Sequence, residues 1–273
     1  MPHHSAAVAH LTDWSSAVRA RRRLGHTIEV HETIGSTNDR ARELLIESGV
    51  DGGVVIAEEQ SAGRGRRGRT WLSPPGVNLM LSVALQPAVL ARDAWQLGLA
   101  TALATRAACV ASIEGSALGL KWPNDLVTSG GRKVAGLLLE TEVTGERLSA
   151  AVLGIGINVN WRRGEMPPDI ATDATSLAEL VGAEVDRVAL LDRLLDALDD
   201  EVTHIEQGRS PLRRYRAACV TIGQEVTVHA AGDTIVGRAV DIDDVGSLVV
   251  ETATSRVALA TGEVAFVRTG LQE

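Results

Sequence analysis

The chain has 273 residues and a formal net charge of -8, from 35 acidic and 27 basic side chains. This balance argues against nucleic acid as the main partner, and two distant cysteines, Cys109 and Cys219, suggest neither a disulfide framework nor a zinc site. Because no apolar run reaches the roughly 18 residues that span a bilayer and the N-terminus lacks signal-peptide features, we expect a cytoplasmic protein without a membrane partner.

The first elements lie after a short N-terminal tail, predicted over 1–26, that is too short for an independent domain. Residues 27–31 alternate in polarity as a strand does. Ser36 then stands three residues before Asp39, a spacing typical of a helix N-cap, and Gly49 ends the predicted helix. Ser36 as a cap and Ser36 as a ligand-binding residue both stay open, because a helix N-terminus offers free N–H groups to a polar ligand.

The most unusual stretch follows a buried strand predicted over 54–57. Four arginines and three glycines alternate here, and we call residues 63–71 the Gly/Arg loop; its members are Gly63, Arg64, Gly65, Arg66, Arg67, Gly68, Arg69, Thr70 and Trp71. Like charges this close repel one another, so the loop is either fully solvated or an anion site. The glycines favour the anion site, because they allow positive φ and let a ligand approach backbone N–H groups closely.

The Gly/Arg loop also matches the spacing of a P-loop, with Arg69 in the lysine position. We reject this interpretation, because a P-loop continues into a helix and the following residues include Pro74 and Pro75. The alternative is a loop that closes over an anionic small molecule, with Trp71 as a flat apolar face for a ring.

The rest of the chain is rich in predicted strands. In chain order we expect a strand over 77–85, a buried helix over 91–113, a strand over 119–122, a hairpin of 126–128 and 134–143, a strand over 148–160 and an amphipathic helix over 190–207. Regular helical crossovers are missing from this pattern, so we expect an α+β fold with a mixed, largely antiparallel sheet backed by helices. After Val220 the polarity period changes to two, and five short strands in about fifty residues, near 225–229, 234–242, 247–251, 256–260 and 263–267, predict a small barrel.

Two further groups of polar residues stand at predicted strand ends. Asp125 has the chemistry to hold Mg²⁺ and Asn124 to hydrogen-bond the edge of a base, although a Pro-Asn-Asp turn without function is an alternative. Lys133, at the mouth of a buried strand, is able to neutralise a phosphate or carboxylate. Together with the Gly/Arg loop, these residues predict an enzyme that handles a nucleoside triphosphate without a P-loop.

Five motifs in this order resemble the signature of biotin protein ligases. They are Gly35-Ser36-Thr37-Asn38, then Glu59-Gln60 leading into the Gly/Arg loop, Lys121-Trp122-Pro123-Asn124-Asp125, the stretch from Arg132 to Glu140, and Gly154-x-Gly156-Ile157-Asn158. The resemblance implies a class II synthetase-like catalytic domain of the biotin and lipoate ligases over 27–219 and an SH3-like C-terminal domain over 220–273. It also implies a monofunctional ligase that binds no DNA, because residues 1–26 leave no room for the winged-helix repressor domain of some members.

The reaction implied by the resemblance has two steps. Biotin and MgATP give biotinyl-5′-adenylate and pyrophosphate, and the biotinyl group then passes to a lysine of the biotin carboxyl carrier domain of a carboxylase. ATP and Mg²⁺ are thus the expected co-substrate and activator, and a homodimer is left open. A lipoate or octanoate ligase is the nearest alternative, but the Gly/Arg loop together with Lys-Trp-Pro-Asn-Asp fits the biotin branch better.

Carried over motif by motif, the resemblance also implies site residues. Those expected to bind biotin are Ser36, Thr37, Asn38, Gln60, Arg64, Gly65, Arg66, Lys133 and Gly136. Those expected to bind ATP and the adenylate are Arg67, Arg69, Trp71, Lys121, Asn124 and Asn158. Catalytic roles fall to Lys133, Arg66 and Asp125, the last also as a Mg²⁺ ligand.

A nucleic-acid-binding module that uses the arginines and the small barrel is an alternative of another class. It requires a basic barrel, whereas this region carries six carboxylates that make it acidic, namely Asp233, Asp241, Asp243, Asp244, Glu251 and Glu263. We therefore expect no nucleic-acid partner. We also expect the Gly/Arg loop to be mobile when empty, because it is rich in glycine and its charges repel one another.

Overall fold

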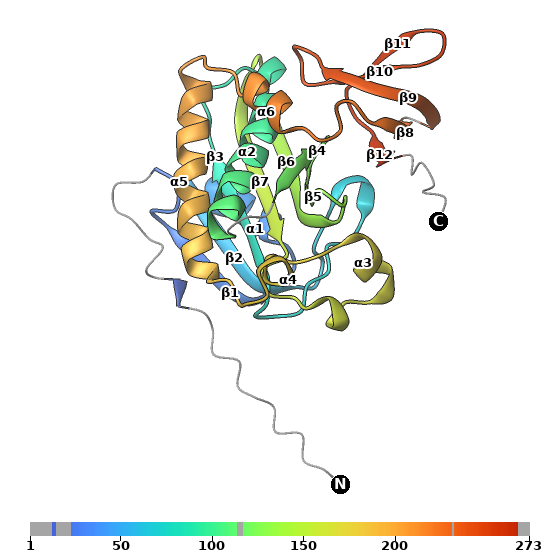
Figure 1. Cartoon of the computed structure of the whole chain (residues 1–273). Helices are drawn as coiled ribbons and strands as arrows, with labels where there is room; N and C mark the ends of the chain where they lie inside the picture. The colour runs from blue at the N-terminus through green and yellow to red at the C-terminus, as the bar shows by residue number, and fades with distance from the viewer. Residues whose placement is uncertain (1–12, 15–22, 114–116, 231, 267–273) are drawn as a thin grey trace.

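The main body of the protein is a seven-stranded sheet with helices on both faces (Figure 1). A computed structural model describes residues 13–14, 23–113, 117–230 and 232–266. The sheet has the order β1-β2-β3-β7-β6-β5-β4, and its strands are β1 (Ile28–Ile34), β2 (Gly53–Gln60), β3 (Leu79–Leu85), β4 (Leu118–Lys121), β5 (Asp125–Thr128), β6 (Lys133–Thr144) and β7 (Arg147–Ile157). β1 and β2 pair in parallel and the other neighbours pair antiparallel, which confirms the predicted mixed, largely antiparallel sheet.

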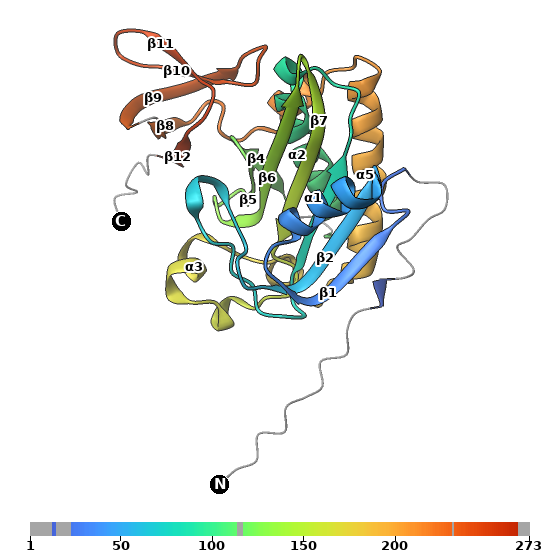
Figure 2. The same ribbon diagram turned by 180° about the vertical axis from the view of Figure 1, so that it is seen from behind.

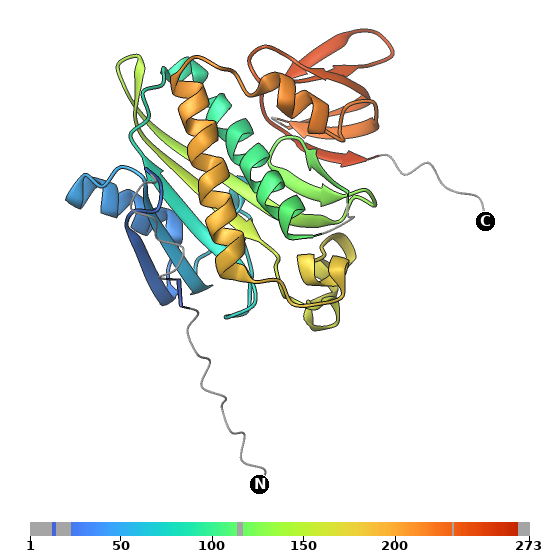
Figure 3. The same ribbon diagram turned by 60° about the vertical axis from the view of Figure 1, so that its left-hand side comes forward.

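Two long helices cover one face of this sheet and a shorter one covers the other. α2 (Trp95–Ser112) and α5 (Arg187–Glu206) pack side by side (Figure 3), while α1 (Thr37–Ser48) lies on the opposite face (Figure 2). Alternation along β2 explains the two layers: Val54 belongs to the core under α2 and α5, and Val55 to the small cluster under α1.

The predicted helix boundaries are largely confirmed. α1 begins after the N-cap Ser36 and ends at Gly49, whose left-handed backbone places its N–H on the Leu45 carbonyl. The Ser36 side chain, however, makes no capping hydrogen bond. Three short helices of five to seven residues were not predicted, α3 (Pro168–Asp173), α4 (Leu177–Val181) and α6 (Leu212–Ala218), because none contains enough turns to show a helical period.

A second, smaller sheet follows α6, and all its strand pairs are antiparallel. Its order is β11-β10-β9-β8-β12, with β8 (Glu225–Ala230), β9 (Asp233–Ile242), β10 (Leu248–Glu251), β11 (Arg256–Leu259) and β12 (Glu263–Phe266). These bounds agree closely with the five strands expected from the period-two pattern. The C-terminal unit is thus an antiparallel sheet of five short strands, in the region where the sequence predicts a small barrel.

The small sheet docks on the end of the large one, beside β4 (Figures 1 and 2). The Val220 N–H donates to the Leu120 carbonyl (2.9 Å), and the Trp122 indole N–H donates to the Gly246 carbonyl (3.1 Å). Gly119 permits this approach, because a Cβ there would lie 2.0 Å from Val220 Cγ1. One hydrophobic cluster therefore contains residues of both sheets.

Both cysteines are buried free thiols, as expected for core residues. None of the described helices combines the length and the apolar character needed to cross a membrane.

Candidate active site

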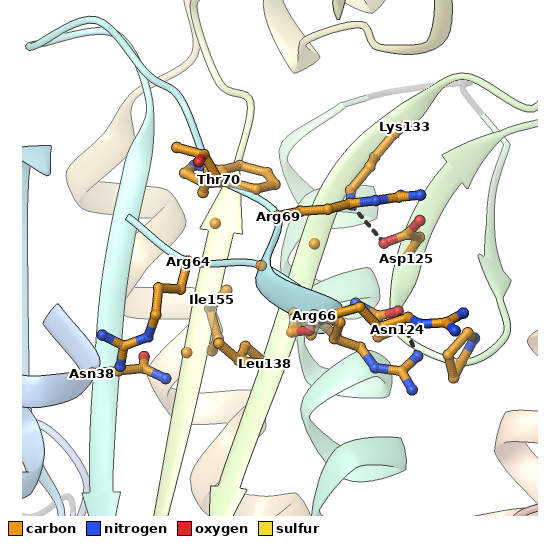
Figure 4. Close-up of a pocket in the computed structure, with 18 of the residues that line it drawn as sticks. Asn38, Arg64, Arg66, Arg69, Thr70, Asn124, Asp125, Lys133, Leu138 and Ile155 are labelled. Carbon is orange, nitrogen blue, oxygen red and sulfur yellow. Dashed lines mark hydrogen bonds and ion pairs between the residues drawn. The ribbon is translucent and has the colours of Figure 1, made fainter. Parts of the chain in front are cut away.

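A cleft of about 1060 Å³, counted to its open mouth, lies between the large sheet, the Gly/Arg loop and β12 (Figure 4). It is lined by residues of strands β2, β3, β6 and β7, by the N-terminus of α1 and by the Lys-Trp-Pro-Asn-Asp turn. Fifteen of the sixteen predicted site residues line it, namely Ser36, Thr37, Asn38, Gln60, Arg64, Gly65, Arg66, Arg67, Arg69, Trp71, Lys121, Asn124, Asp125, Lys133 and Gly136. Asn158 does not.

The end of the cleft near α1 is a polar floor with few charges. The Gln60 side-chain oxygen accepts hydrogen bonds from the Thr37 N–H (2.8 Å) and hydroxyl (3.1 Å). The Ser82 hydroxyl donates to the Asn38 side-chain oxygen (2.6 Å), and the Asn38 amide donates to Glu140 (3.0 Å). Because Thr37, Asn38 and Ser82 are buried, these bonds fix which donors and acceptors the floor presents to a ligand.

Glycines in β6 and β7 make room for the side chains that cross the cleft. A Cβ at Gly154 would lie 2.4 Å from Asn38 Oδ1, and a Cβ at Gly156 would lie 2.6 Å from the Trp71 indole. At Gly136 it would lie 2.8 Å from Lys133 Nζ. The strand glycines thus mark places where side chains of the site itself approach the backbone closely.

Lys133 stands at the start of β6, between a carboxylate and an aromatic ring. Its ammonium lies 2.7 Å from Asp125 Oδ1, a contact drawn in Figure 4, and 5.5 Å from the centroid of the Trp71 ring. Asp125 begins β5, so the pairing of β5 with β6 brings the two charges together. A lysine held in this way presents a fixed positive charge to the cleft.

The Gly/Arg loop is a compact hairpin. The Gly65 N–H donates to the Arg69 carbonyl (2.7 Å) and the Trp71 N–H to the Gly63 carbonyl (2.9 Å). The sequence-based expectation that glycines leave backbone N–H groups open to a ligand is therefore wrong for Gly65. Of the three glycines in the loop only Gly68 has a positive φ, and Gly63 is instead required because its Cβ would lie 2.6 Å from the Trp71 carbonyl oxygen.

Each arginine of the loop has an acceptor outside the loop. Two of them pair with carboxylates: Arg64 binds Asp39 with two hydrogen bonds (2.6 and 2.7 Å), and Arg69 binds Glu263 of β12. These contacts hold the pKa of the Asp39 and Glu263 carboxyl groups below their usual range. Part of the self-repulsion in the loop is thus relieved by the protein itself.

Among the residues that the structure describes, the other two arginines donate hydrogen bonds only to neutral oxygens. Arg66 donates to the Thr261 hydroxyl (2.7 Å) and to the Asn124 side-chain oxygen (3.3 Å), and Arg67 donates to the His229 carbonyl (2.9 Å). Burial lowers the pKa of Arg66, because it disfavours the charged form. These two guanidinium groups are the loop charges best placed to receive an anion from outside.

Two asparagines differ in their surroundings. The Asn124 amide donates to the Leu137 carbonyl (2.8 Å), which orients its side chain toward the cleft beside Arg66 (Figure 4). Asn158 is buried, and its amide donates to the Thr175 carbonyl (3.2 Å). The sequence predicted both as ATP-binding residues, but the structure brings only Asn124 to the cleft wall.

Several residues that hydrogen-bond to the cleft lining were not predicted from the sequence. Ser82 is the buried polar residue in an otherwise apolar strand, a signal that was available in the sequence. Asp39, Glu140 and Thr261 are recognised only from their partners, which are more than 20 residues away along the chain. Such pairings depend on the tertiary fold and leave no local pattern.

Two carboxylates, Asp125 and Glu263, line the cleft. Among the described residues no three His, Cys, Asp or Glu side chains group as a metal site would require. Mg²⁺ commonly uses one or two carboxylates and completes its shell with water and substrate phosphates. The residues present therefore fit a Mg²⁺ ion that arrives with a nucleoside triphosphate.

Family models match both parts of the chain. The biotin/lipoate A/B protein ligase family matches residues 30–158, and the biotin protein ligase C terminal domain matches residues 221–267. The chain is 36% identical over 247 residues to a biotin--[acetyl-CoA-carboxylase] ligase of Mycobacterium tuberculosis, covering 88% of this chain and 89% of that protein. It is 32% identical over 237 residues to the bifunctional ligase/repressor BirA of Bacillus subtilis, and the match covers 84% of this chain and 70% of that protein.

Among solved structures, the biotin protein ligase of Aquifex aeolicus in complex with biotin and ATP superposes with a TM-score of 0.75. The identity is 29%, and the match covers 89% of this chain and 99% of that one. The large sheet, the cleft and the small sheet thus agree with the sequence comparisons, and the chain belongs to the biotin protein ligase family.

Proposed function

We propose that the chain activates biotin with MgATP and transfers the biotinyl group to a lysine of a biotin carboxyl carrier domain. In the first step a carboxylate oxygen of biotin attacks the α-phosphorus of ATP, and pyrophosphate leaves. In the second step the lysine amine attacks the carbonyl carbon of the adenylate, and AMP leaves. The observation that carries this proposal is the position of Lys133 between Asp125 and Trp71, in a cleft with a polar floor at one end and cations at the other.

The first step brings an anionic carboxylate to a polyanionic triphosphate, so charge neutralisation and positioning are its main requirements. The Lys133 ammonium is a fixed charge suited to the space between the carboxylate and the α-phosphate. Its ion pair with Asp125 keeps it in that position until the substrates provide anions of their own. We therefore assign Lys133 the main catalytic role and Asp125 the role of orienting it; Asp125 would also hold Mg²⁺, which would neutralise part of the phosphate charge.

The polar floor suits the ureido ring of biotin, which carries a carbonyl acceptor and N–H donors. Thr37 and Gln60 offer hydroxyl and amide groups whose orientation is fixed by their mutual bonds and by the buried Ser82 hydroxyl. The remaining predicted residues keep their proposed roles: Ser36, Asn38, Arg64, Gly65, Arg66 and Gly136 at biotin, and Arg67, Arg69, Trp71, Lys121 and Asn124 at ATP and the adenylate.

Asn158 is the weakest of these assignments, because its amide is engaged with the Thr175 carbonyl outside the cleft wall. The proposed division into a catalytic domain over 27–219 and a C-terminal domain over 220–273 is kept. Support for it comes from the two family models, which match on either side of residue 220. The adenylate is a reactive mixed anhydride, and the Gly/Arg loop above it is placed to exclude water.

The test is biotin transfer to the apo carrier domain of a carboxylase, followed by mass spectrometry, for the wild type and two variants. Lys133→Ala removes the proposed catalytic charge, and we expect it to abolish biotinylation while its circular dichroism matches that of the wild type. Arg132→Ala is the matched control, because Arg132 is the neighbouring cation and does not line the cleft. Normal turnover by Lys133→Ala would refute the role of Lys133.

A further inference from the structure

Lys121 lines the cleft, and its ammonium group makes a cation–π contact with an aromatic ring. Within the described part of the chain its amine has no hydrogen bond and no ion pair, and it lies 5.0 Å from the centroid of the Phe266 ring. Phe266 belongs to β12 and so comes from the small sheet, whereas Lys121 ends β4 of the large sheet. The contact therefore joins the two sheets at the wall of the cleft.

Three other cations of the cleft already form ion pairs with carboxylates of the chain. Lys133 pairs with Asp125, Arg64 with Asp39 and Arg69 with Glu263. Lys121 is half-buried, and burial lowers its pKa because the charged form loses hydration. The aromatic ring and the charges of Asp125, Glu263 and Asp173, none of which forms an ion pair with Lys121, offset only part of that loss. Within the described residues the ammonium therefore has no anion in direct contact and can take one from a ligand.

The position of Lys121 indicates which anion that is. Lys121 lines the same cleft as Arg66 and Arg67, which donate to the Thr261 hydroxyl and the His229 carbonyl of the C-terminal unit. The polar floor near α1 holds hydroxyl and amide groups instead. If biotin occupies the floor, as proposed above, the cationic end is left for the most highly charged part of ATP.

We propose that Phe266 is a positioning residue that holds the Lys121 ammonium ready for the β- and γ-phosphates of ATP, which leave as pyrophosphate. This inference rests on the proposed function and adds to it a role for the small sheet in the first step alone. Pyrophosphate takes with it the phosphates that Phe266 readies Lys121 to bind. The transfer of the biotinyl group is therefore expected not to depend on Phe266, although Lys121 stays beside the adenylate.

The experiment measures pyrophosphate release by the full chain with biotin and MgATP, for Phe266→Leu, Phe266→Tyr and Lys121→Met. Phe266→Leu keeps an apolar side chain but loses the ring, and we expect the KM for MgATP to rise about 3- to 10-fold, the range of a partly buried cation–π contact. Phe266→Tyr keeps the ring and is expected to stay near the wild-type value. The KM for biotin is expected to stay within about twofold in both variants, because the floor is unchanged.

Two further readouts separate a positioning role from a general structural one. Transfer from preformed biotinyl-adenylate to the carrier domain is expected to proceed at the wild-type rate in Phe266→Leu. In a Lys121→Met background, Phe266→Leu is expected to add no further rise in the KM for MgATP, because the ring then has no ammonium to hold.

An unchanged KM for MgATP in Phe266→Leu would overturn the proposal, as would full additivity with Lys121→Met. Slower transfer from preformed adenylate, or a rise in the KM for biotin equal to that for MgATP, would also overturn it and assign Phe266 a structural role. Failure of the proposed function itself looks different, because the wild type would then release no pyrophosphate when biotin is added.

Discussion

The shape of the cleft floor depends on glycines, because an added methyl group at some of them would overlap a neighbouring side chain. At Gly154 an added methyl group would overlap Asn38 Oδ1, which accepts a hydrogen bond from Ser82, while the Asn38 amide donates to Glu140. These two bonds and the missing methyl group form one unit, since displacement of Asn38 also releases its partners.

We predict that Gly154→Ala weakens biotin binding without unfolding the protein. Overpacking of this kind costs about 1–3 kcal/mol, and we expect a rise of about tenfold or more in the KM for biotin, tenfold being about 1.4 kcal/mol. Gly164→Ala is the matched control, because a Cβ there meets no atom within 4 Å. A wild-type KM in Gly154→Ala would show that Asn38 does not shape the biotin site.

Lys121 gives a prediction for the pH dependence of the first step. Burial is the largest cause that lowers its pKa and Lys133 adds to it, while Asp125, Glu263 and Asp173 act in the opposite direction. The ammonium is fully charged below this lowered pKa and loses its proton as the pH rises through it, earlier than an exposed lysine would.

The KM for MgATP is therefore expected to rise in the alkaline range for the wild type. Lys121→Arg keeps its charge throughout that range, so its profile is expected to stay flat. Profiles of pyrophosphate release with saturating biotin check this. An equal rise in the KM for MgATP in the wild type and in Lys121→Arg would mean that a group other than Lys121 titrates.

At the scale of elements, the Gly/Arg loop is fastened at both ends of the cleft. Arg64 ties it to Asp39 of α1, and Arg66, Arg67 and Arg69 tie it to the small sheet. The Asp39 and Arg64 side chains are 48% and 37% exposed, so this ion pair is expected to contribute little on its own. This arrangement fits a loop whose opening, which admits the substrates, requires little free energy.

Limited proteolysis of the Gly/Arg loop reports how readily the loop opens. We predict faster cleavage in Asp39→Asn, by at most about fivefold because an exposed ion pair is worth up to about 1 kcal/mol. Glu43→Gln, which removes an exposed partner of Arg40 on the same helix, is expected to leave the rate unchanged. Biotin with MgATP is expected to protect the loop, and equal cleavage with and without the ligands would argue against closure.

The sequence predicted some elements much better than others. The five strands after Val220 were placed closely because their period of two is strong, and α1 because Gly49 ends it at a left-handed residue. The short helices between β7 and β8 were missed for lack of a period. At the cleft, ordered motifs predicted the lining residues, whereas Asp39 and Phe266 depend on contacts between distant segments, which no local pattern encodes.

At the scale of the whole molecule, the two sheets share one hydrophobic core. Trp122 and Val220 make hydrogen bonds across the junction, and Gly119 leaves the space in which Val220 packs. The small sheet is therefore expected to unfold together with the large one rather than as an independent unit.

We predict one cooperative thermal transition, with coincident midpoints by tryptophan fluorescence and far-ultraviolet circular dichroism. Gly119→Ala is expected to reduce the free energy of unfolding by about 1–3 kcal/mol, because its methyl group overlaps Val220. Gly130→Ala is the control, since its Cβ would make an ordinary contact of 3.8 Å with Thr128. Two separate transitions in the wild type would contradict a shared core.

The most direct measurement is pyrophosphate release from MgATP by the purified protein, run in parallel with biotin, with lipoate and with neither. We predict that pyrophosphate release requires biotin and is not supported by lipoate, because the polar floor offers donors and acceptors to a ureido ring. Equal release with lipoate would keep the fold but change the substrate, and release without either acid would contradict the proposed adenylation.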